Sequence, residues 1–335
     1  MEGFKKTILI TGGLGFIGKH VVRNFVLKYP EYFIINFDAV TYAADYSAHK
    51  DLRGRKNLMF FKGDVTNADS LKEVFEKYHP TDIIHLAAES HVDNSLLNPT
   101  IFVDTNVLGT VQLLKFTKEE WQSAEGHKFI NMATDEIFGS LDADGIPFTE
   151  ESPINPHSPY SASKAAQYLL GKAYYDAYKL PVISVACGNA IGEGQYPEKL
   201  VPLTLKNIIL RKNIPIYGRG EQMRDWTNIE DIFNAFDSLI QGGKAGELYN
   251  IGGDACVSNI FMVHSLIDEY VKQTGENKEE IEKLITFIPD PRKGAHDFRY
   301  DINHSKITSE LGWKPKCTFK DSVRVAVEDA IRRFK

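Results

Sequence analysis

The feature that most constrains the fold is a glycine-rich turn between a strand pattern and a helix pattern near the start of the chain. An aliphatic run at 7–10 leads into the turn, which has glycine at positions 12, 15 and 18. In such a turn the three glycines allow a tight bend, a close approach to a pyrophosphate, and packing of the helix on the strand. The helix N-terminus attracts the phosphates. We therefore expect cofactor contacts from Gly12, Gly15, Phe16, Ile17 and Gly18.

An acidic residue closes the second predicted strand. Asp38 follows the last glycine by about 20 residues, where a carboxylate binds the ribose hydroxyls of adenosine. A carboxylate there repels a 2′-phosphate, so NAD is expected rather than NADP. Asp64 and Val65 end the third strand, where adenine would rest, and Ala87 and Ala88 form a small-residue turn that a cofactor can approach closely.

Strand and helix patterns alternate through the first half of the chain. The predicted strands after the second are 57–61, 82–86 and 128–132, and a long helix is expected at about 99–118. This alternation predicts an α/β fold with a doubly wound parallel Rossmann sheet. We expect an NAD-binding domain at 1–187, with returning segments near 214–254 that include a strand at 247–251. A smaller C-terminal α/β substrate lobe is expected at 188–335.

Composition and charge exclude several classes of function. The net charge of -6 gives no general attraction to nucleic acid or to anionic membranes. Three cysteines without C-x-x-C spacing predict neither a disulfide framework nor a metal site, and they favour the reducing cytoplasm. The first residues run into a strand without a secretory h-region, and no apolar run approaches membrane-spanning length.

Two carboxylates follow the fifth predicted strand directly. The strand pattern at 128–132 is succeeded by Ala133, Thr134, Asp135 and Glu136. Ligands bind at the carboxyl ends of the strands in an open α/β sheet, so adjacent acids there can serve as acid and base for one small molecule. Taken alone, the pair is more simply explained as a solvated strand end, and the surrounding motifs decide between the two interpretations.

A tyrosine and a lysine lie four residues apart at the start of a helix predicted at 160–178. At this spacing Tyr160 and Lys164 share one helix face. A nearby ammonium is expected to lower the pKa of the phenol, which could then exchange a proton with a sugar hydroxyl near neutral pH. Such pairs also occur by chance on helix surfaces, but the glycine turn and the two acids favour a catalytic role.

Together these motifs resemble the extended short-chain dehydrogenase/reductase superfamily. The glycine turn and the Tyr160-x-x-x-Lys164 pair carry this resemblance, and Thr134-Asp135-Glu136 is similar to the nucleotide-sugar 4,6-dehydratases within it. Sister epimerases and decarboxylases usually have a Ser-type residue at the position of Asp135. Further matching segments, spread over nearly the whole chain, lie at 87–93, 197–202, 216–220, 224–226, 250–253 and 311–315.

The resemblance implies a reaction with a role for each motif residue. Tyr160 takes the proton of the sugar 4-hydroxyl while hydride passes from carbon 4 to NAD, and Thr134 hydrogen-bonds the developing keto oxygen. Glu136 then removes the carbon 5 proton, and Asp135 protonates the departing 6-hydroxyl. Return of the hydride to carbon 6 and of a proton to carbon 5 gives a 4-keto-6-deoxy sugar nucleotide.

The resemblance also implies a site for a nucleotide-diphospho-sugar. Lys199 and Arg224 are expected at the diphosphate, because a guanidinium suits phosphate oxygens, and Arg219 is expected near the base. His91 is more simply a hydrogen-bonded loop residue than a base. The full predicted substrate set is Ser90, His91, Asn189, Lys199, Leu200, Tyr217, Arg224, Asn259, Arg292 and His296.

The sequence departs from the family pattern at two loops. The family has Asn-Tyr at the positions of Ala190 and Ile191, in a loop expected to border the sugar or its phosphates. The change implies either an altered sugar pocket, with room for a 2-acetamido group, or drift compensated elsewhere. The loop at 290–300 is two residues longer than usual, and its Phe298 replaces an arginine, which leaves open the choice between thymidine and uridine.

The leading hypothesis is therefore a nucleotide-diphospho-hexose 4,6-dehydratase acting on dTDP- or UDP-glucose. UDP-N-acetylglucosamine is an alternative substrate, and reprotonation of carbon 5 from the other face would add 5-epimerase activity. A UDP-sugar 4-epimerase or decarboxylase and a cofactor-binding regulatory protein are the remaining alternatives. Family members pair the helices at 99–118 and 160–178 in a four-helix bundle, so a homodimer is expected.

Overall fold

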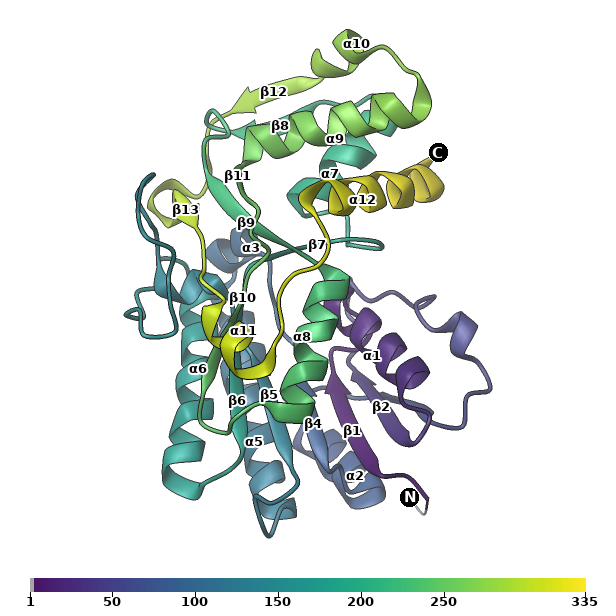
Figure 1. The fold of residues 1–335 in the computed structure, drawn as a ribbon, viewed down its shortest axis with the longest axis vertical. Helices are drawn as coiled ribbons and strands as arrows, with labels where there is room; N and C mark the ends of the chain where they lie inside the picture. The colour runs from purple at the N-terminus through teal and green to yellow at the C-terminus, as the bar shows by residue number, and fades with distance from the viewer. Residues whose placement is uncertain (1–2) are drawn as a thin grey trace.

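A seven-stranded sheet organises the larger lobe of the protein (Figure 1). The computed structural model describes residues 3–335, and the first two residues of the predicted 1–187 domain lie outside the described residues. The strand order is β10-β6-β5-β4-β1-β2-β3, and every neighbouring pair is parallel. The strands are β1 (Lys6–Thr11), β2 (Tyr32–Asp38), β3 (Leu58–Lys62), β4 (Asp82–His85), β5 (Lys128–Met132), β6 (Val182–Cys187) and β10 (Leu248–Ile251).

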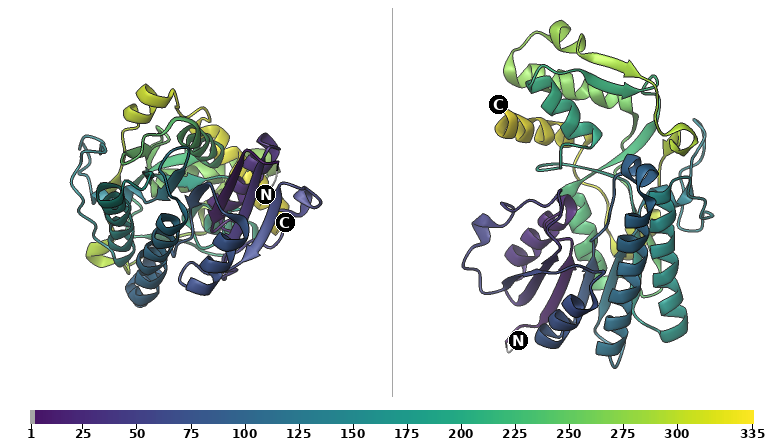
Figure 2. Two further views of the ribbon diagram at one scale, coloured as in Figure 1. Left: turned by 90° about the horizontal axis from the view of Figure 1, so that it is seen from below. Right: turned by 180° about the vertical axis from the view of Figure 1, so that it is seen from behind.

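Helices cover both faces of this sheet, which confirms the predicted fold class (Figures 1 and 2). Successive residues of β1 point to opposite faces: Ile8 and Ile10 pack in one apolar cluster and Leu9 in another. The first cluster includes α1 (Phe16–Lys28) and α8 (Ile229–Gly242). The second includes α2 (Ala68–Tyr78) and α5 (Gly109–Glu120), with α6 (Pro159–Tyr178) packed against it. Because both faces are buried, polar side chains can collect only at the strand ends.

The smaller lobe is built around two short sheets above the carboxyl edge of the main sheet (Figure 1). One has the order β11-β9-β13 with β7 paired to β9, and the other pairs β12 with β8. The strands are β7 (Asn189–Ile191), β8 (Ile214–Tyr217), β9 (Met223–Asn228), β11 (Cys256–Ser258), β12 (Ile285–Ile288) and β13 (Arg299–Tyr300). An apolar cluster joins these sheets to α7 (Leu200–Ile209), α9 (Asn259–Thr274) and α12 (Phe319–Phe334).

Short helices complete the fold. They are η1 (Lys50–Leu52), α3 (Val92–Leu97), α4 (Pro99–Phe102), η2 (Val103–Leu108), η3 (Asp135–Phe138), α10 (Lys278–Glu282), η4 (Lys293–Ala295) and α11 (Ser305–Leu311). None of the helices within residues 3–335 is long and apolar enough to cross a membrane.

The strand predicted at 247–251 does rejoin the main sheet, as β10 beside β6. The segment that returns to the larger lobe is shorter than the predicted 214–254, because β8 and β9 belong to the sheets of the smaller lobe. The long helix predicted at 99–118 is formed by α4 and α5 with a π-helical stretch, η2, between them. An insertion of this kind often marks a functional site.

The glycine turn fits tightly between β1, α1 and β4. Gly12 has φ +71°, and a Cβ atom there would lie 2.7 Å from the backbone nitrogen of Ala87. A Cβ atom on Gly18 would lie 2.0 Å from the carbonyl oxygen of Gly12. Both contacts are with backbone atoms, which cannot move aside as a flexible side chain can. The turn therefore requires glycine at both positions.

Replacing Gly18 by alanine should destabilise the protein. The added methyl group must push the first turn of α1 away from β1, which typically costs about 1–3 kcal/mol for overpacking and more against backbone. Urea denaturation will measure the loss. Gly294→Ala is the matched control, because nothing lies within 4 Å of a Cβ atom there. Equal unfolding midpoints for the two variants would contradict the packing argument.

Candidate functional site

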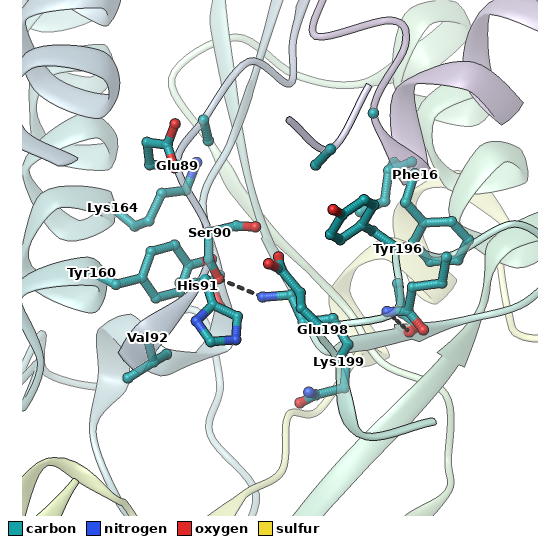
Figure 3. A pocket seen from close by; sticks show the side chains of 18 of the residues that line it. Phe16, Glu89, Ser90, His91, Val92, Tyr160, Lys164, Tyr196, Glu198 and Lys199 are labelled. Atoms are coloured by element: carbon teal, nitrogen blue, oxygen red, sulfur yellow. Dashed lines mark hydrogen bonds between the residues drawn. The ribbon is translucent and has the colours of Figure 1, made fainter. Parts of the chain in front are cut away.

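A cavity of about 490 Å³ lies where the carboxyl edge of the main sheet meets the smaller lobe (Figure 3). That volume is typical of small-molecule sites. Apart from Arg219, every residue predicted to contact a cofactor or a substrate, or to take part in catalysis, lines this cavity. The structure thus brings together side chains that are up to 284 residues apart in sequence, from Gly12 to His296.

The glycine turn and the ends of β1, β2, β3 and β4 form one half of the cavity. Asp38 braces the turn, because its Oδ2 accepts from the Leu14 N–H at 2.9 Å and its Oδ1 from the Val40 N–H at 2.7 Å. The N-cap of α1 is Gly15, which has no side chain to satisfy the first N–H groups of the helix. Those donors point to an anion site. Val65, Ala87 and Ala88 add an apolar wall.

The two carboxylates begin the short helix η3 directly after β5. The Thr134 hydroxyl donates to Asp135 Oδ1 at 3.1 Å, and its oxygen accepts from the Glu136 N–H at 3.4 Å. Asp135 is 2% exposed, and its Oδ2 has no hydrogen-bond partner among the described residues. A carboxylate oxygen buried in this way is costly unless it is protonated or meets a ligand. Burial without a partner therefore favours the protonated form of Asp135, a residue that lines the cavity.

The environments of the two acids differ. Burial, followed by the charge of Glu136, raises the pKa of Asp135 well above its ordinary value. Burial also raises the pKa of Glu136, but the positive charges of Arg224, Arg292 and Lys199 act in the opposite direction. Adjacent acids with unequal environments can divide the roles of acid and base. This difference favours Asp135 as the acid and Glu136 as the base.

Tyr160 and Lys164 do lie on one face of α6 at the cavity, but the expected effect of Lys164 on Tyr160 is wrong. Burial, followed by the negative charge of Glu136, raises the pKa of Tyr160. The Lys164 ammonium donates to Met132 O and Gln167 Oε1, both at 2.5 Å. Burial lowers the pKa of Lys164 to about 7. Desolvation is thus the largest cause of both shifts and favours the neutral form of each group.

The smaller lobe and the loop after β4 form the other half of the cavity. Figure 3 shows Lys199 reaching across to the carbonyl oxygen of Ser90, at 2.7 Å. Burial lowers the pKa of Lys199. The Tyr217 hydroxyl donates to Asp93 Oδ2 at 2.9 Å, and Asp93 also pairs with Arg292. These contacts hold the basic groups of the cavity in place without neutralising all of them.

Three more of the predicted substrate residues have hydrogen-bond partners beside the cavity. The Arg224 guanidinium donates to three backbone carbonyls, those of residues 223, 297 and 298. It is largely buried, with one Nη2 hydrogen and the Nε hydrogen left for other partners. His296 pairs with Asp290 through Nδ1. His91 caps α3 by accepting from the Asn94 N–H, in agreement with the simpler interpretation of that residue.

Two expectations for the substrate half are corrected. The segment expected to be a loop at Ala190 and Ile191 is strand β7, which pairs with β9, and Ile191 is buried in the core of the smaller lobe. Only Ala190 lines the cavity, so only this substitution can alter its shape. Arg219 lies outside the residues that line the cavity; its side chain is 84% exposed and pairs with Glu221.

Several residues in or beside the cavity were given no role at the site from the sequence. Glu89 and Glu198 face the cavity in Figure 3. Asn106, in the π-helical stretch, accepts from the Glu89 N–H at 2.9 Å and donates to the Glu89 carbonyl at 3.0 Å. Its polar side chain in mid-helix was the one available signal. Tyr300 lines the cavity too, and nothing in the local sequence links it to Glu136, 164 residues away.

Comparisons with known proteins agree with this geometry. The family model described as GDP-mannose 4,6 dehydratase matches residues 9–326. The dTDP-glucose 4,6-dehydratase of Haemophilus influenzae is 40% identical over 329 residues, which cover 96% of each chain. A solved dTDP-glucose 4,6-dehydratase from Bacillus anthracis in complex with NAD is 37% identical, with a TM-score of 0.85. The alignment covers 98% of this chain and 97% of the solved chain.

Two further solved structures place this chain in context. DesIV, a dTDP-glucose 4,6-dehydratase from Streptomyces venezuelae with NAD and TYD bound, is 35% identical, with a TM-score of 0.89. The alignment covers 98% of this chain and 97% of the DesIV chain. The UDP-glucose 4-epimerase of Thermotoga maritima has a TM-score of 0.85, and the alignment covers 98% of this chain and 100% of the epimerase chain. At 22% identity, this similarity shows only that the two proteins share a fold.

Asp135→Asn should stabilise the protein increasingly as the pH rises. The raised pKa means that the folded protein binds this proton more tightly than the unfolded chain does. Wild-type stability therefore falls as the pH climbs above the ordinary range of an aspartate, and the neutral amide avoids that loss. We expect a gain of at least about 1 kcal/mol at mildly alkaline pH, vanishing at acidic pH.

Denaturant unfolding at a series of pH values will measure this gain. Asp144→Asn, at an exposed carboxylate, is the matched control and should leave stability unchanged. A gain for Asp135→Asn that does not depend on pH would show that desolvation of the carboxylate is not its cause.

Proposed function

We propose that this chain, which belongs to the GDP-mannose 4,6 dehydratase family, is an NAD-dependent nucleotide-diphospho-hexose 4,6-dehydratase. One observation carries the proposal: the carboxylates of Asp135 and Glu136 line the same cavity as Tyr160 and the glycine turn. Oxidation at carbon 4 needs the cofactor turn and a proton acceptor. Elimination of water needs an acid and a base side by side. The relatives named dTDP-glucose 4,6-dehydratase support the same activity.

NAD is the proposed cofactor, and the residues present fit it. The uncapped N-terminus of α1 suits the diphosphate, and the glycines at 12 and 18 allow the tight turn that packs α1 against β1. Asp38 is placed to bind the ribose hydroxyls, and Asp64 and Val65 are placed to contact the adenine. When bound, NAD supplies a hydride acceptor that later acts as a hydride donor. Two solved relatives contain NAD.

The chain's own residues handle the protons. In its ionised form Tyr160 takes the proton from the sugar 4-hydroxyl, with Lys164 one helical turn further along α6, and Thr134 donates a hydrogen bond to the developing keto oxygen. Glu136 takes the carbon 5 proton, made acidic by the neighbouring ketone. Asp135 protonates the 6-hydroxyl as it leaves as water. The unequal environments of the two carboxylates support this division of roles.

The substrate proposed first is dTDP-glucose, because the curated relatives that match most of this chain bear that name. The basic groups of the smaller lobe, chiefly Lys199, Arg224 and Arg292, are placed to receive its diphosphate and nucleotide. UDP-N-acetylglucosamine is a second candidate, because Ala190 lines the cavity and leaves room for a larger sugar substituent. Mass spectrometry of each candidate sugar nucleotide after incubation will show which loses water.

Glu136→Gln should separate the two halves of the reaction. Oxidation at carbon 4 needs no base at carbon 5, so reduced nicotinamide should accumulate, whereas loss of water should slow by at least about 100-fold. Nicotinamide absorbance and product mass measure the two halves. Glu73→Gln, at an exposed residue of α2, should match the wild type. Water loss at the wild-type rate in Glu136→Gln would rule out this residue as the base.

We also propose that the protein is a homodimer formed through a four-helix bundle. Large apolar side chains are exposed on the two long helical segments of the larger lobe, namely Ile101, Val103, Leu108 and Leu169. Stripes of this kind from two copies can meet around a twofold axis, so that the same side chains become buried in both copies. The free cysteines support a reducing compartment, and we propose the cytoplasm.

Leu169→Glu should convert the proposed dimer to a monomer. Leu169 is 50% exposed on α6, and a buried carboxylate in each copy would oppose association. Sedimentation velocity will measure the change. Phe261→Glu, at a similarly exposed position on α9 in the smaller lobe, should leave association unchanged. A monomeric wild-type protein would refute this mode of assembly.

We further propose a division of labour between the lobes. The segment at 1–187, with its returning strand β10, would hold NAD, and the segment at 188–335 would mainly hold the sugar nucleotide. The cavity supports this division, because its cofactor half is built by β1–β4 and much of its substrate half by the smaller lobe.

A further inference from the structure

A chain of hydrogen bonds leads from Glu136 toward the surface of the protein. The Tyr300 hydroxyl donates to Asp297 Oδ2 at 2.6 Å and lies 3.5 Å from Glu136 Oε2. The other carboxylate oxygen of Asp297 lies 2.6 Å from His157 Nδ1. The side chain of Asp297 is 4% exposed and that of His157 is 36% exposed. The chain thus begins at the carboxylate in the cavity and ends at an imidazole that meets solvent.

The surroundings hold each member of this chain in place. The Arg224 guanidinium stacks 4.3 Å from the centre of the Tyr300 ring and donates to the Asp297 carbonyl at 3.1 Å. Nδ2 of Asn155 lies 3.0 Å from His157 Nε2. The Asn155 N–H donates to the carbonyl of Ile137, in the same short helix as Glu136. The loop that carries His157 is therefore anchored to the helix that carries the proposed base.

We propose that Tyr300, Asp297 and His157 form a proton path between Glu136 and solvent. The proposal rests on the proposed function, in which Glu136 takes the carbon 5 proton. Asp297 and His157 act through Tyr300, so they are positioning residues whose hydrogen bonds also carry a proton. An imidazole suits the outer end, because it gains and releases protons near neutral pH.

The transfers balance at every link. After Glu136 has taken the proton from carbon 5, it gives a proton to the Tyr300 oxygen, and the phenol passes its own proton to Asp297. The carboxyl group turns and protonates Nδ1 of His157 in its Nε2–H tautomer, and the resulting imidazolium releases its Nε2 proton to water. His157 is left as the Nδ1–H tautomer, the form in which Nε2 can accept from Asn155 Nδ2. Tyr300, Asp297 and His157 then hold as many protons as before, and Glu136 is again a carboxylate. The reverse sequence starts from this tautomer, delivers a solvent proton for carbon 5 and restores the Nε2–H form.

The path has a chemical consequence that a purely structural role lacks. Glu136 is partly buried beside the cavity, where bound ligands would exclude water. With the path intact, the proton returned to carbon 5 comes from solvent. With the path broken, Glu136 keeps the substrate's own proton and returns it. The origin of the hydrogen at carbon 5 therefore reports on the path, independently of the rate.

The test uses a sugar nucleotide deuterated at carbon 5, incubated in ordinary water, with proton NMR and mass spectrometry of the product. The wild-type protein should give a dehydrated product that has lost the deuterium. In His157→Asn the amide nitrogen can replace Nδ1 in the bond to Asp297 but cannot relay a proton. We expect this variant to retain several-fold more deuterium at carbon 5 in its dehydrated product.

Two further variants keep the result interpretable. His79→Asn removes a comparable histidine–carboxylate pair, with Glu120 at 2.8 Å, outside the cavity lining, and should lose deuterium as the wild type does. In His157→Ala, added imidazole should restore the loss of deuterium by taking the vacated place.

The outcomes separate the path from the proposed function. A wild-type protein that makes no dehydrated product would refute the proposed function. A wild-type protein that dehydrates its substrate yet keeps the deuterium would overturn the path alone. So would deuterium retention in both His157 variants equal to that of the wild type.

Discussion

Removal of carboxylates from water is the physical constraint on which this site depends. Helices cover both faces of the parallel sheet, so β5 can present polar groups only where it ends. Asp135 and Glu136 stand at that end, and neither can keep a full hydration shell. The cost appears as raised pKa values, which make proton transfer possible at neutral pH where ordinary carboxylates would stay ionised. Burial of the two carboxylates therefore costs the fold some stability.

The same desolvation governs the other ionisable groups of the cavity. It raises the pKa of Tyr160 and lowers that of Lys164, so both groups are shifted toward neutrality. Three cations moderate the effect at Glu136, because Arg224, Arg292 and Lys199 all lower its pKa. The residues that bind the diphosphate in the proposed complex therefore also tune the proposed base. In the proposed complex, substrate recognition and proton transfer therefore share one set of charges.

Local pattern was enough to predict the fold class and many of the residues that line the cavity. Gly12, Asp38, Asp135 and Tyr160 stand at fixed places in strand–turn–helix units, and such units meet at one edge of a parallel sheet. What failed depends on tertiary packing. The expected influence of Lys164 on Tyr160 ignored burial, and Ile191 joined a core that forms only when β7 pairs with β9.

Contacts between distant segments were beyond the reach of the sequence for the same reason. His157, Asp297 and Tyr300 come from a loop and from the strand region near the C-terminus, and only the folded chain aligns them with Glu136. Arg219 is an error of the opposite kind. A motif match placed it at the substrate, but its side chain is exposed to solvent. Residue type and spacing predicted which chemistry was present, but not how each group is solvated.

The central claim is that burial sets Asp135 and Glu136 apart as acid and base. Site-specific carbon-13 labelling of the two carboxyl groups, followed by NMR across a pH series, tests it most directly. We expect both groups to titrate above the ordinary carboxylic range and Asp135 to hold its proton to the higher pH. Titration of both groups at ordinary carboxylic pKa values would contradict this role of burial.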